Sequence, residues 1–370
     1  MAKTLEQIQA ELEALKTQFT DFSAVSPVSY YTHQYSGEEI DQAVGTLVRP
    51  NLLDNWYFGR PVDQRGGYVV PPGVEYKDVN TGITVGTTTT YYPVTQWSNG
   101  NAIITVDGLN RFVQPGGFVR GYVGQGYTFD RWKTENNIVV TLERDGVSLE
   151  NVGNIAGQYN QELPPDFSSE GTLLCISVIV KSVSGDARLF LSQSMVPYGH
   201  PIDFIPLQTG LYSGSGNLMN GNHKFAIYLG AGAKIKLAAA KLELGPTQTL
   251  AHQENGQWVL NEVPDYGEQL RRCQRYFVRL RQYAQARASQ IERDYIDFAL
   301  PVPVPMRSLP VIHGGTFHVM YITGGVSNGF SFSVAAQSDN NLRVRAKKTG
   351  HNLQDATLEV ANYLDLSADL

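Results

Sequence analysis

Cysteine is scarce in this chain, since only Cys175 and Cys273 occur in 370 residues. Small secreted domains that depend on disulfides carry many more, so that class of protein is excluded. Cys175 lies in an apolar strand pattern and Cys273 lies near a domain boundary. Two buried, unpaired thiols are expected, as in a protein that matures in a reducing cytosol, and a disulfide between them is the alternative that the sequence leaves open.

Long apolar runs and a positive net charge are also missing. No window approaches about 18 uncharged apolar residues, and the first residues, MAKTLEQIQAELEALK, contain no apolar signal core. We therefore expect neither a membrane span nor a signal peptide. The formal charge is -6, so the chain as a whole offers no electrostatic reason to bind nucleic acid.

Catalytic motifs are largely absent. The sequence has no His-Glu-x-x-His, Cys-x-x-Cys, Gly-x-Ser-x-Gly or Walker motif. The glycines between 121 and 126 precede no helix, so they predict a loop and not a dinucleotide site. His313, His318 and His351 could bind a metal, but isolated histidines in a β domain are more often exposed or hydrogen-bonded. Scattered carboxylates leave a glycosidase pair open, because sequence order cannot show their separation.

The chain is rich in turns and aromatic residues, with 36 glycines and 20 tyrosines. Between residues 101 and 244, at least six short strand patterns alternate with Gly, Asn and Pro turns. The pairs Asp145-Gly146 and Gly185-Asp186 are flanked by alternating residues and predict hairpins. Strands in series without intervening helices predict a mainly β fold with a β-sandwich of the jelly-roll type.

The segment 240–277 separates this module from a second one. Before it, the strand pattern 235–244 predicts core-facing Ile235, Leu237, Leu242 and Leu244, with the lysines and Glu243 in water. Gly245-Pro246 ends that strand, and after Pro264 a short helix leads into a new strand. The predicted division is a coiled-coil helix at 1–24, a linker with a short helix at 25–49, a jelly roll at 50–247, a linker at 248–265, and a smaller C-terminal β domain for receptor binding or trimerisation at 266–370.

The N-terminal segment carries an apolar heptad pattern. Its apolar residues recur at spacings of three and four: Leu5, Ile8, Leu12, Leu15, Phe19 and Phe22. Leu at position a with Ile at position d disfavours a two-stranded coil, so we predict a trimer. An amphipathic helix packed on its own domain is the alternative.

Several motifs resemble one family of proteins. They are Asn51-Leu52-Leu53-Asp54-Asn55, Gln64-Arg65-Gly66, Trp132, Lys241-Leu242-Glu243-Leu244-Gly245, Cys273-Gln274-Arg275-Tyr276-Phe277 and Met306-Arg307-Ser308-Leu309-Pro310. Together they resemble the jelly-roll modules, and the "CQRYY" and "MRxxP" pair, of tail-fibre proteins of tailed bacteriophages and prophages. Phe277 in place of Tyr is a modest departure. The resemblance implies a fold similar to carbohydrate-binding modules, and it leaves open a structural Ca²⁺ ion as the one cofactor.

Aromatic side chains supply flat apolar surfaces that match the C–H faces of sugar rings. The candidate glycan contacts in the jelly roll are Trp56, Tyr92, Trp97, Tyr122 and Tyr127. Those in the C-terminal domain are His318, Tyr321, Phe330, Arg343 and Arg345. Each is also a residue that a sheet core or face would contain, and Trp132 is a candidate plug of the sandwich.

A run of arginines follows the boundary segment: Arg271, Arg272, Arg275, Arg279, Arg281, Arg287 and Arg293. Alternation along 275–283 places Tyr276, Val278 and Leu280 on one face and Phe277, Arg279 and Arg281 on the other. A solvated or inter-subunit face, with arginines paired to carboxylates such as Glu268, Glu292 and Asp294, is favoured over phosphate binding.

The sequence therefore predicts a non-enzymatic virion protein. We expect a homotrimeric phage tail fibre or receptor-binding protein, made in the bacterial cytoplasm, that joins other virion proteins through its N-terminal region and attaches to host cell-surface glycans. A head fibre or capsid decoration protein without a specific receptor is the first alternative. A tailspike-type glycan hydrolase is the second.

Overall fold

The computed structural model describes residues 49–164, 171–193, 202–218, 221, 223–321 and 325–368. The chain divides into two compact units, Met1–Pro50 and Asn51–Leu370. The short helix predicted in the 25–49 linker lies outside the described residues. So do the predicted trimerisation residues, Leu5, Ile8, Leu12, Leu15, Phe19 and Phe22. The coiled coil and the trimer therefore stay predictions.

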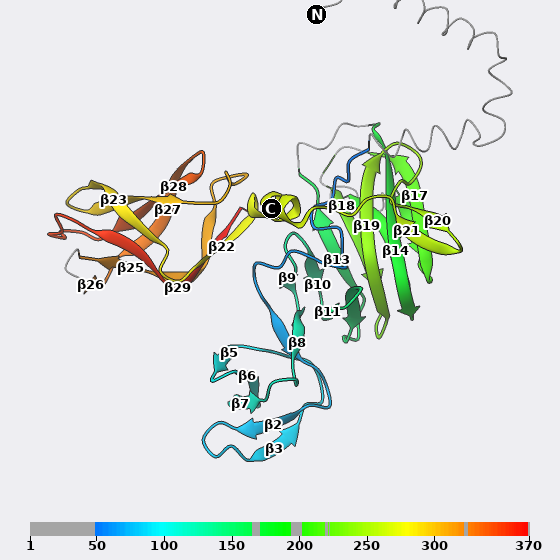
Figure 1. Cartoon of the computed structure of the whole chain (residues 1–370), viewed down its shortest axis with the longest axis horizontal. Coiled ribbons are helices and arrows are strands. Elements are labelled where there is room, and N and C mark those ends of the chain that lie inside the picture. Colours follow the sequence, from blue (N-terminus) through cyan, green and yellow to red (C-terminus); the bar gives the residue numbers. More distant parts are fainter. Residues whose placement is uncertain are drawn as a thin grey trace, which may run out of the picture. The chain divides into compact units, whose positions relative to one another are not determined.

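The larger unit is mainly β, and its strands form antiparallel sheets (Figure 1). The first sheet has eight strands in the order β17-β14-β19-β12-β11-β8-β1-β4. Their bounds are β17 Gly210–Asn217, β14 Leu173–Ser184, β19 Lys234–Leu244, β12 Gly146–Asn151, β11 Ile138–Glu143, β8 Val119–Val123, β1 Tyr68–Val70 and β4 Tyr92–Pro93.

A second sheet completes a sandwich with the first. Its order is β16-β15-β18-β13-β10-β9, with bounds β16 Ile202–Pro206, β15 Ala187–Gln193, β18 His223–Leu229, β13 Gly157–Glu162, β10 Lys133–Glu135 and β9 Gly126–Tyr127. One cluster of buried apolar side chains draws on both sheets. Within it, the Trp132 ring stacks on Tyr159 at a centroid distance of 4.9 Å, and its Nε1 donates to the Asn55 carbonyl at 3.0 Å. The predicted mainly β, jelly-roll-like sandwich is confirmed.

The two glycine turns have different outcomes. The hairpin predicted at Asp145-Gly146 is confirmed, because β11 and β12 pair on either side of it. The hairpin predicted at Gly185-Asp186 is wrong, since β14 pairs with β17 and β19 whereas β15 pairs with β16 and β18. This turn carries the chain from one sheet to the other. Gly185 has a φ of 81°, and a Cβ there would lie 2.9 Å from the Ala233 Cα, so only glycine fits.

Strand β19 departs from the predicted alternation. Lys241 and Glu243 are buried and Leu244 is exposed, whereas the pattern had placed the charged residues in water. The chain after β19 covers this face: Thr249 accepts a hydrogen bond from Lys241 Nζ at 2.9 Å and donates its backbone N–H to Glu243 at 2.6 Å. The hairpin of β20 (Ala251–Glu254) and β21 (Gln257–Leu260) follows directly.

A small five-stranded sheet is inserted between β1 and β8 (Figure 1, blue to cyan). Its order is β3-β2-β7-β6-β5, with bounds β3 Thr84–Thr87, β2 Glu75–Asp78, β7 Leu109–Val113, β6 Asn101–Val106 and β5 Gln96–Ser98. It has its own small apolar cluster, which includes Ile104 and Val113.

The C-terminal part begins with a helix, as predicted after Pro264. Helix α4 spans Tyr266–Gln274, and the Asp265 side chain caps it by accepting from the Glu268 N–H at 2.9 Å. The sheet that follows runs β26-β25-β29-β23-β24-β28-β27, with β22 paired to β29. Bounds are β22 Phe277–Arg281, β23 Gln285–Ile291, β24 Tyr295–Pro301, β25 Val311–Met320, β26 Val326–Ser327, β27 Ser331–Ser338, β28 Asn341–Lys347 and β29 Thr357–Ser367.

This part has a separate apolar core, to which β22 contributes Val278 and, partly buried, Leu280. The alternation predicted for that strand is thereby confirmed. Cys175 and Cys273 are both buried and neither forms a disulfide, which confirms the prediction of two thiols that are not joined to each other.

Candidate functional site

An exposed tryptophan stands out on the inserted sheet. Trp97 lies on β5, and Asn99 and Gly100, both with positive φ, form the tight turn that leads into β6. The Trp97 side chain is 50% exposed. The turn therefore presents a large apolar ring to solvent. About half of the ring's surface stays in contact with water, and a ligand that covers it would gain hydrophobic free energy.

Two further rings hold Trp97 in place, and we call Tyr68, Trp97 and Phe118 the aromatic cluster. The Trp97 ring meets Phe118 at 4.9 Å and Tyr68 at 5.2 Å between centroids, edge to face in both cases. Tyr68 and Phe118 are also in contact, at 5.8 Å. Because each ring restricts the motion of the others, the Trp97 side chain loses little conformational entropy when a ligand stacks on its exposed face.

A cation borders the aromatic cluster. The guanidinium of Arg120 lies 5.5 Å from the centre of the Tyr68 ring. The carboxylate of Asp63 pairs with Arg120 and accepts a hydrogen bond from the Tyr122 hydroxyl. These polar groups bond to one another and support the aromatic cluster from beside it, while the exposed Trp97 ring is the surface offered to a ligand.

The remaining jelly-roll candidates have structural roles. Trp56 is 2% exposed and belongs to the sandwich core. Tyr92 is partly buried against the cluster of the inserted sheet. Burial raises the pKa of Tyr122 well above its ordinary value, and its hydroxyl also accepts from the Gly67 N–H at 3.1 Å. Tyr127 packs under the guanidinium of Arg65 at 4.9 Å.

The C-terminal candidates are spread over several strands. His318 lies on β25, and Tyr321 follows that strand and is 41% exposed. Phe330 contacts the His351 ring at 5.7 Å. Arg345 forms a two-pronged ion pair with the buried Asp297, at 2.7 and 2.8 Å, so its charge is already compensated. The structure does not gather these side chains into one site.

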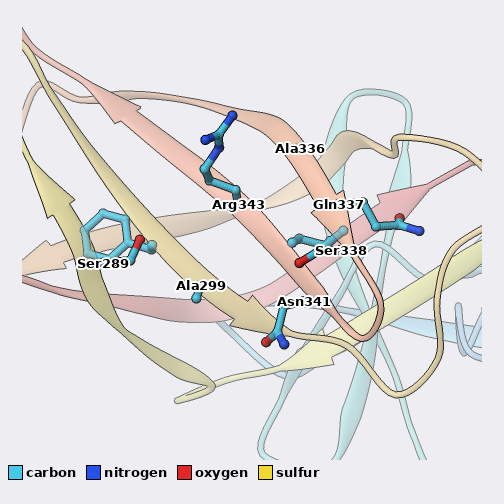
Figure 2. Close-up of a pocket in the computed structure, with 9 residues that line it drawn as sticks. Ser289, Ala299, Ala336, Gln337, Ser338, Asn341 and Arg343 are labelled. Carbon is cyan, nitrogen blue, oxygen red and sulfur yellow. The ribbon is translucent and has the colours of Figure 1, made fainter.

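Arg343 lines a shallow groove of about 320 Å³ on the C-terminal sheet (Figure 2). Ser338 and Asn341 lie opposite each other where β27 turns into β28. Within the described ranges, neither of these two side chains forms a hydrogen bond. The groove offers hydroxyl, amide and guanidinium groups to a polar ligand, but its one aromatic residue, Phe298, is buried.

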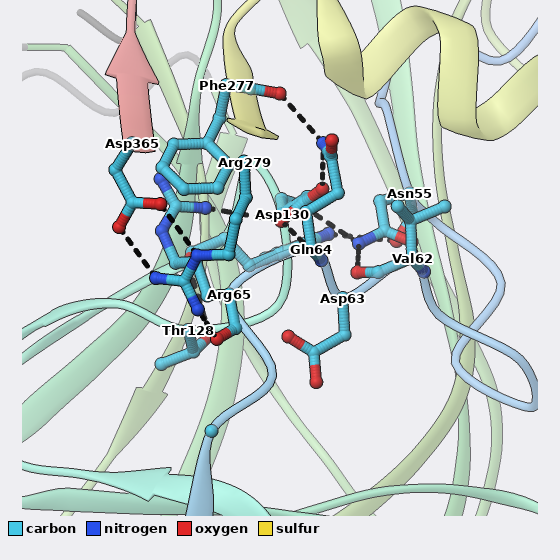
Figure 3. A network of polar contacts seen from close by, with 12 residues as sticks. Asn55, Val62, Asp63, Gln64, Arg65, Thr128, Asp130, Phe277, Arg279 and Asp365 are labelled. Carbon is cyan, nitrogen blue, oxygen red and sulfur yellow. Dashed lines mark hydrogen bonds and ion pairs between the residues drawn. The ribbon is translucent and has the colours of Figure 1, made fainter. Parts of the chain in front are cut away.

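A polar network joins the sandwich to the first C-terminal strand (Figure 3). Gln64 donates from Nε2 to Asp130 at 2.6 Å and to the Phe277 carbonyl at 2.7 Å. Arg279 binds both oxygens of Asp365 at 2.6 Å and donates to the carbonyl of Arg65. Burial raises the pKa of Asp130 to about 7. The polar groups of this network are occupied by one another, so we assign it a structural role.

Two of the arginines predicted to lie on a solvated or inter-subunit face have different partners from those expected. Arg279 pairs with Asp365, and Arg272 pairs with Asp54 at 2.8 Å. The expected carboxylates, Glu268 and Asp294 among them, are near in sequence, whereas the actual ones are brought in by the tertiary fold.

Neither a metal cluster nor a membrane helix is found in the part of the chain that the structure describes. No three His, Cys, Asp or Glu side chains there lie close enough together to hold a metal ion. Among the same residues, no helix is both long and apolar enough to cross a bilayer.

No protein-family model matches the chain, and no curated protein matches it. Among solved structures, it is similar to a chain in the atomic structure of Sulfolobus Turreted Icosahedral Virus, with 11% identity over 82% of this chain and 79% of that chain and a TM-score of 0.15. It is also similar to vicilin from Corylus avellana (hazelnut), with 9% identity over 68% of this chain and 84% of that chain and a TM-score of 0.12. Neither likeness carries a functional argument, so the function is inferred from the residues of this chain.

Proposed function

We propose that the chain is a non-enzymatic subunit of a virion fibre that attaches to host cell-surface glycans as a homotrimer. The observation that supports glycan binding most directly is the half-exposed Trp97 ring, held by Tyr68 and Phe118. The N-terminal heptad pattern supports the trimer, and the resemblance of the sequence motifs to phage fibres supports the virion.

Trimerisation matters because a single stacked ring binds sugar weakly. Three copies of the aromatic cluster on one assembly would engage a polymeric surface together, and such avidity raises an affinity by about 10² to 10⁴. Weak individual sites then suffice for attachment.

The test is binding of the full-length protein to a panel of bacterial cells and to polysaccharides extracted from them, with the native mass recorded in parallel. Trp97→Ala is expected to weaken binding by at least about tenfold, since it removes the stacking surface. Tyr283→Ala is the matched control, because Tyr283 is the more exposed ring, at 68%, and lies outside the aromatic cluster.

Three outcomes contradict the proposal in different ways. Unchanged binding by a folded Trp97→Ala variant removes the aromatic cluster from it. A trimer that binds no cell or polysaccharide points to a head fibre or decoration role instead. Shortening of the polysaccharide during incubation points to a glycan hydrolase.

A further inference from the structure

A second pocket lies beside helix α4. It encloses about 440 Å³ between the helix and the segment before β25. Arg271, Arg272, Arg275 and Arg307 line it together with one carboxylate, Glu268. We call it the arginine pocket. Arg271 and Arg275 alone set two positive charges against the one carboxylate, which is a local excess of positive charge in a chain whose formal charge is -6.

Two of these guanidinium groups are available to a ligand. Arg271 and Arg275 are four residues apart, so they project from the same side of α4. Both are exposed, and among the residues that the structure describes their side chains have no ion pair or hydrogen bond. Arg272, in contrast, is occupied by Asp54 at 2.8 Å. Unpaired arginines that line a pocket favour an anion as its occupant.

The walls of the pocket are fixed by hydrogen bonds and burial. The Arg307 N–H donates to the Arg275 carbonyl at 2.6 Å, which ties the two walls together. Met306 is 4% exposed in the C-terminal core, and its carbonyl accepts from Gln337 Nε2 at 2.8 Å. The arginine pocket is therefore held in shape before any ligand arrives, which lowers the entropic cost of binding.

The floor of the pocket suits a sugar ring. Val304 and Pro305 supply apolar atoms that are not fully buried, and a saccharide presents C–H faces to such a surface. Guanidinium groups bind carboxylate and phosphate oxygens through paired N–H donors. We infer that the arginine pocket binds an acidic saccharide unit, with its carboxylate or phosphate on Arg271 and Arg275 and its ring on the apolar floor.

The saccharide part of this inference rests on the proposed function, and it adds that the attachment glycan is anionic. Glu268 refines the specificity. Its carboxylate lines the same pocket and repels an anion, so it weakens binding of any acid and disfavours the more highly charged phosphate most.

The experiment titrates the full-length protein with three probes that share a ring, namely glucose, glucuronate and glucose 6-phosphate, and follows binding by protein NMR or calorimetry. At least one of the two acidic probes is expected to bind at millimolar or lower concentration. Glucose is expected not to bind in that range. Arg271→Gln and Arg275→Gln are each expected to weaken binding by about tenfold, as charge-assisted hydrogen bonds are lost. Glu268→Gln is expected to strengthen it.

Arg281→Gln is the matched control, because Arg281 is exposed on β22 and outside the pocket. An equal loss in Arg281→Gln would mean that general surface charge, and not the pocket, attracts the anion. Equal binding of glucose would overturn the role of the arginines. The inference would also be overturned if the protein bound a single-stranded oligonucleotide and not the sugars, with an affinity that rises with the length of the oligonucleotide. If Arg271→Gln and Arg275→Gln change nothing while Trp97→Ala still weakens attachment to cells, only this inference fails and the proposed function stands.

Discussion

Asp130 makes the stability of the protein depend on pH in an unusual direction. It is fully buried, and burial raises its pKa from 3.8 to about 7, although Arg65 lies 3.3 Å away and Gln64 donates hydrogen bonds to it. The nearby carboxylate of Asp63 adds to the rise. The folded state thus holds a proton on Asp130 up to a pH at which the unfolded chain has lost it.

Because the folded state binds the extra proton, this contribution to stability is complete below pH 3.8 and is lost as the pH rises to about 7. One pKa unit corresponds to about 1.4 kcal/mol, so between pH 5 and pH 8 Asp130 should cost the native state about 3 kcal/mol. Carboxylates with lowered pKa, such as Glu162 and Asp145, act in the opposite direction and at more acidic pH.

The assay is urea unfolding of the wild type and of Asp130→Asn at pH 5, 6, 7 and 8. The asparagine keeps an oxygen for Gln64 but does not titrate, and the histidines contribute equally to both proteins. The wild type should lose about 3 kcal/mol relative to Asp130→Asn across this range. Two parallel pH profiles would refute the reasoning, since they would mean that Asp130 stays ionised or is hydrated in the native state.

Three other outcomes follow from the fold. Trp132→Ala should destabilise the sandwich by about 3 to 5 kcal/mol in urea unfolding, because it empties the centre of the core, and a loss below about 1 kcal/mol would contradict that placement. Gly315→Ala should cost more than about 2 kcal/mol, because its Cβ would lie 1.7 Å from a backbone carbonyl of β29 at a φ of 92°. Gly350→Ala is the control, because Gly350 also has a positive φ, of 70°, but has open space around it; this variant should lose about 1 kcal/mol of unfolding free energy. Equal losses in the two variants would show that a small shift of the backbone relieves the close contact at Gly315. Cys175 and Cys273 are buried, and burial raises the pKa of Cys273 well above its ordinary value. Neither thiol should therefore react with a disulfide reagent until urea unfolds the protein. Rapid labelling of the native protein would contradict this prediction.

Local signals in the sequence predicted much of the fold. The turn at Asp145-Gly146 and the helix capped by Asp265 depend on neighbours within a few residues, so their patterns could be read directly. The turn at Gly185-Asp186 carries the same local signal, but the choice of strand partners is made by distant strands. The burial of Lys241 and Glu243 likewise depends on a segment that returns over β19, which alternation along one strand cannot reveal.

The candidate site shows the same limit. Trp97 could be proposed from its residue type. Tyr68 and Phe118 could not be assigned to it, because Tyr68 lies on β1 and Phe118 directly precedes β8, both far from Trp97 in the sequence. The arginine pocket joins Arg275 and Arg307, and each belongs to one of the two motifs that carried the resemblance to phage fibres. The motifs were visible in the sequence, but their contact was not.

The attachment of the inserted sheet has a consequence for how this protein can change. The segment leaves the sandwich after β1, adds β4 to its edge beside β1, and returns at β8. Strands β1 and β8 are paired neighbours, with Val69 opposite Val119. Both junctions therefore lie side by side on one edge of the framework. A segment connected in this way can be exchanged as a cassette by recombination, which would replace Trp97 while Tyr68 on β1 and the core of the framework stay in place.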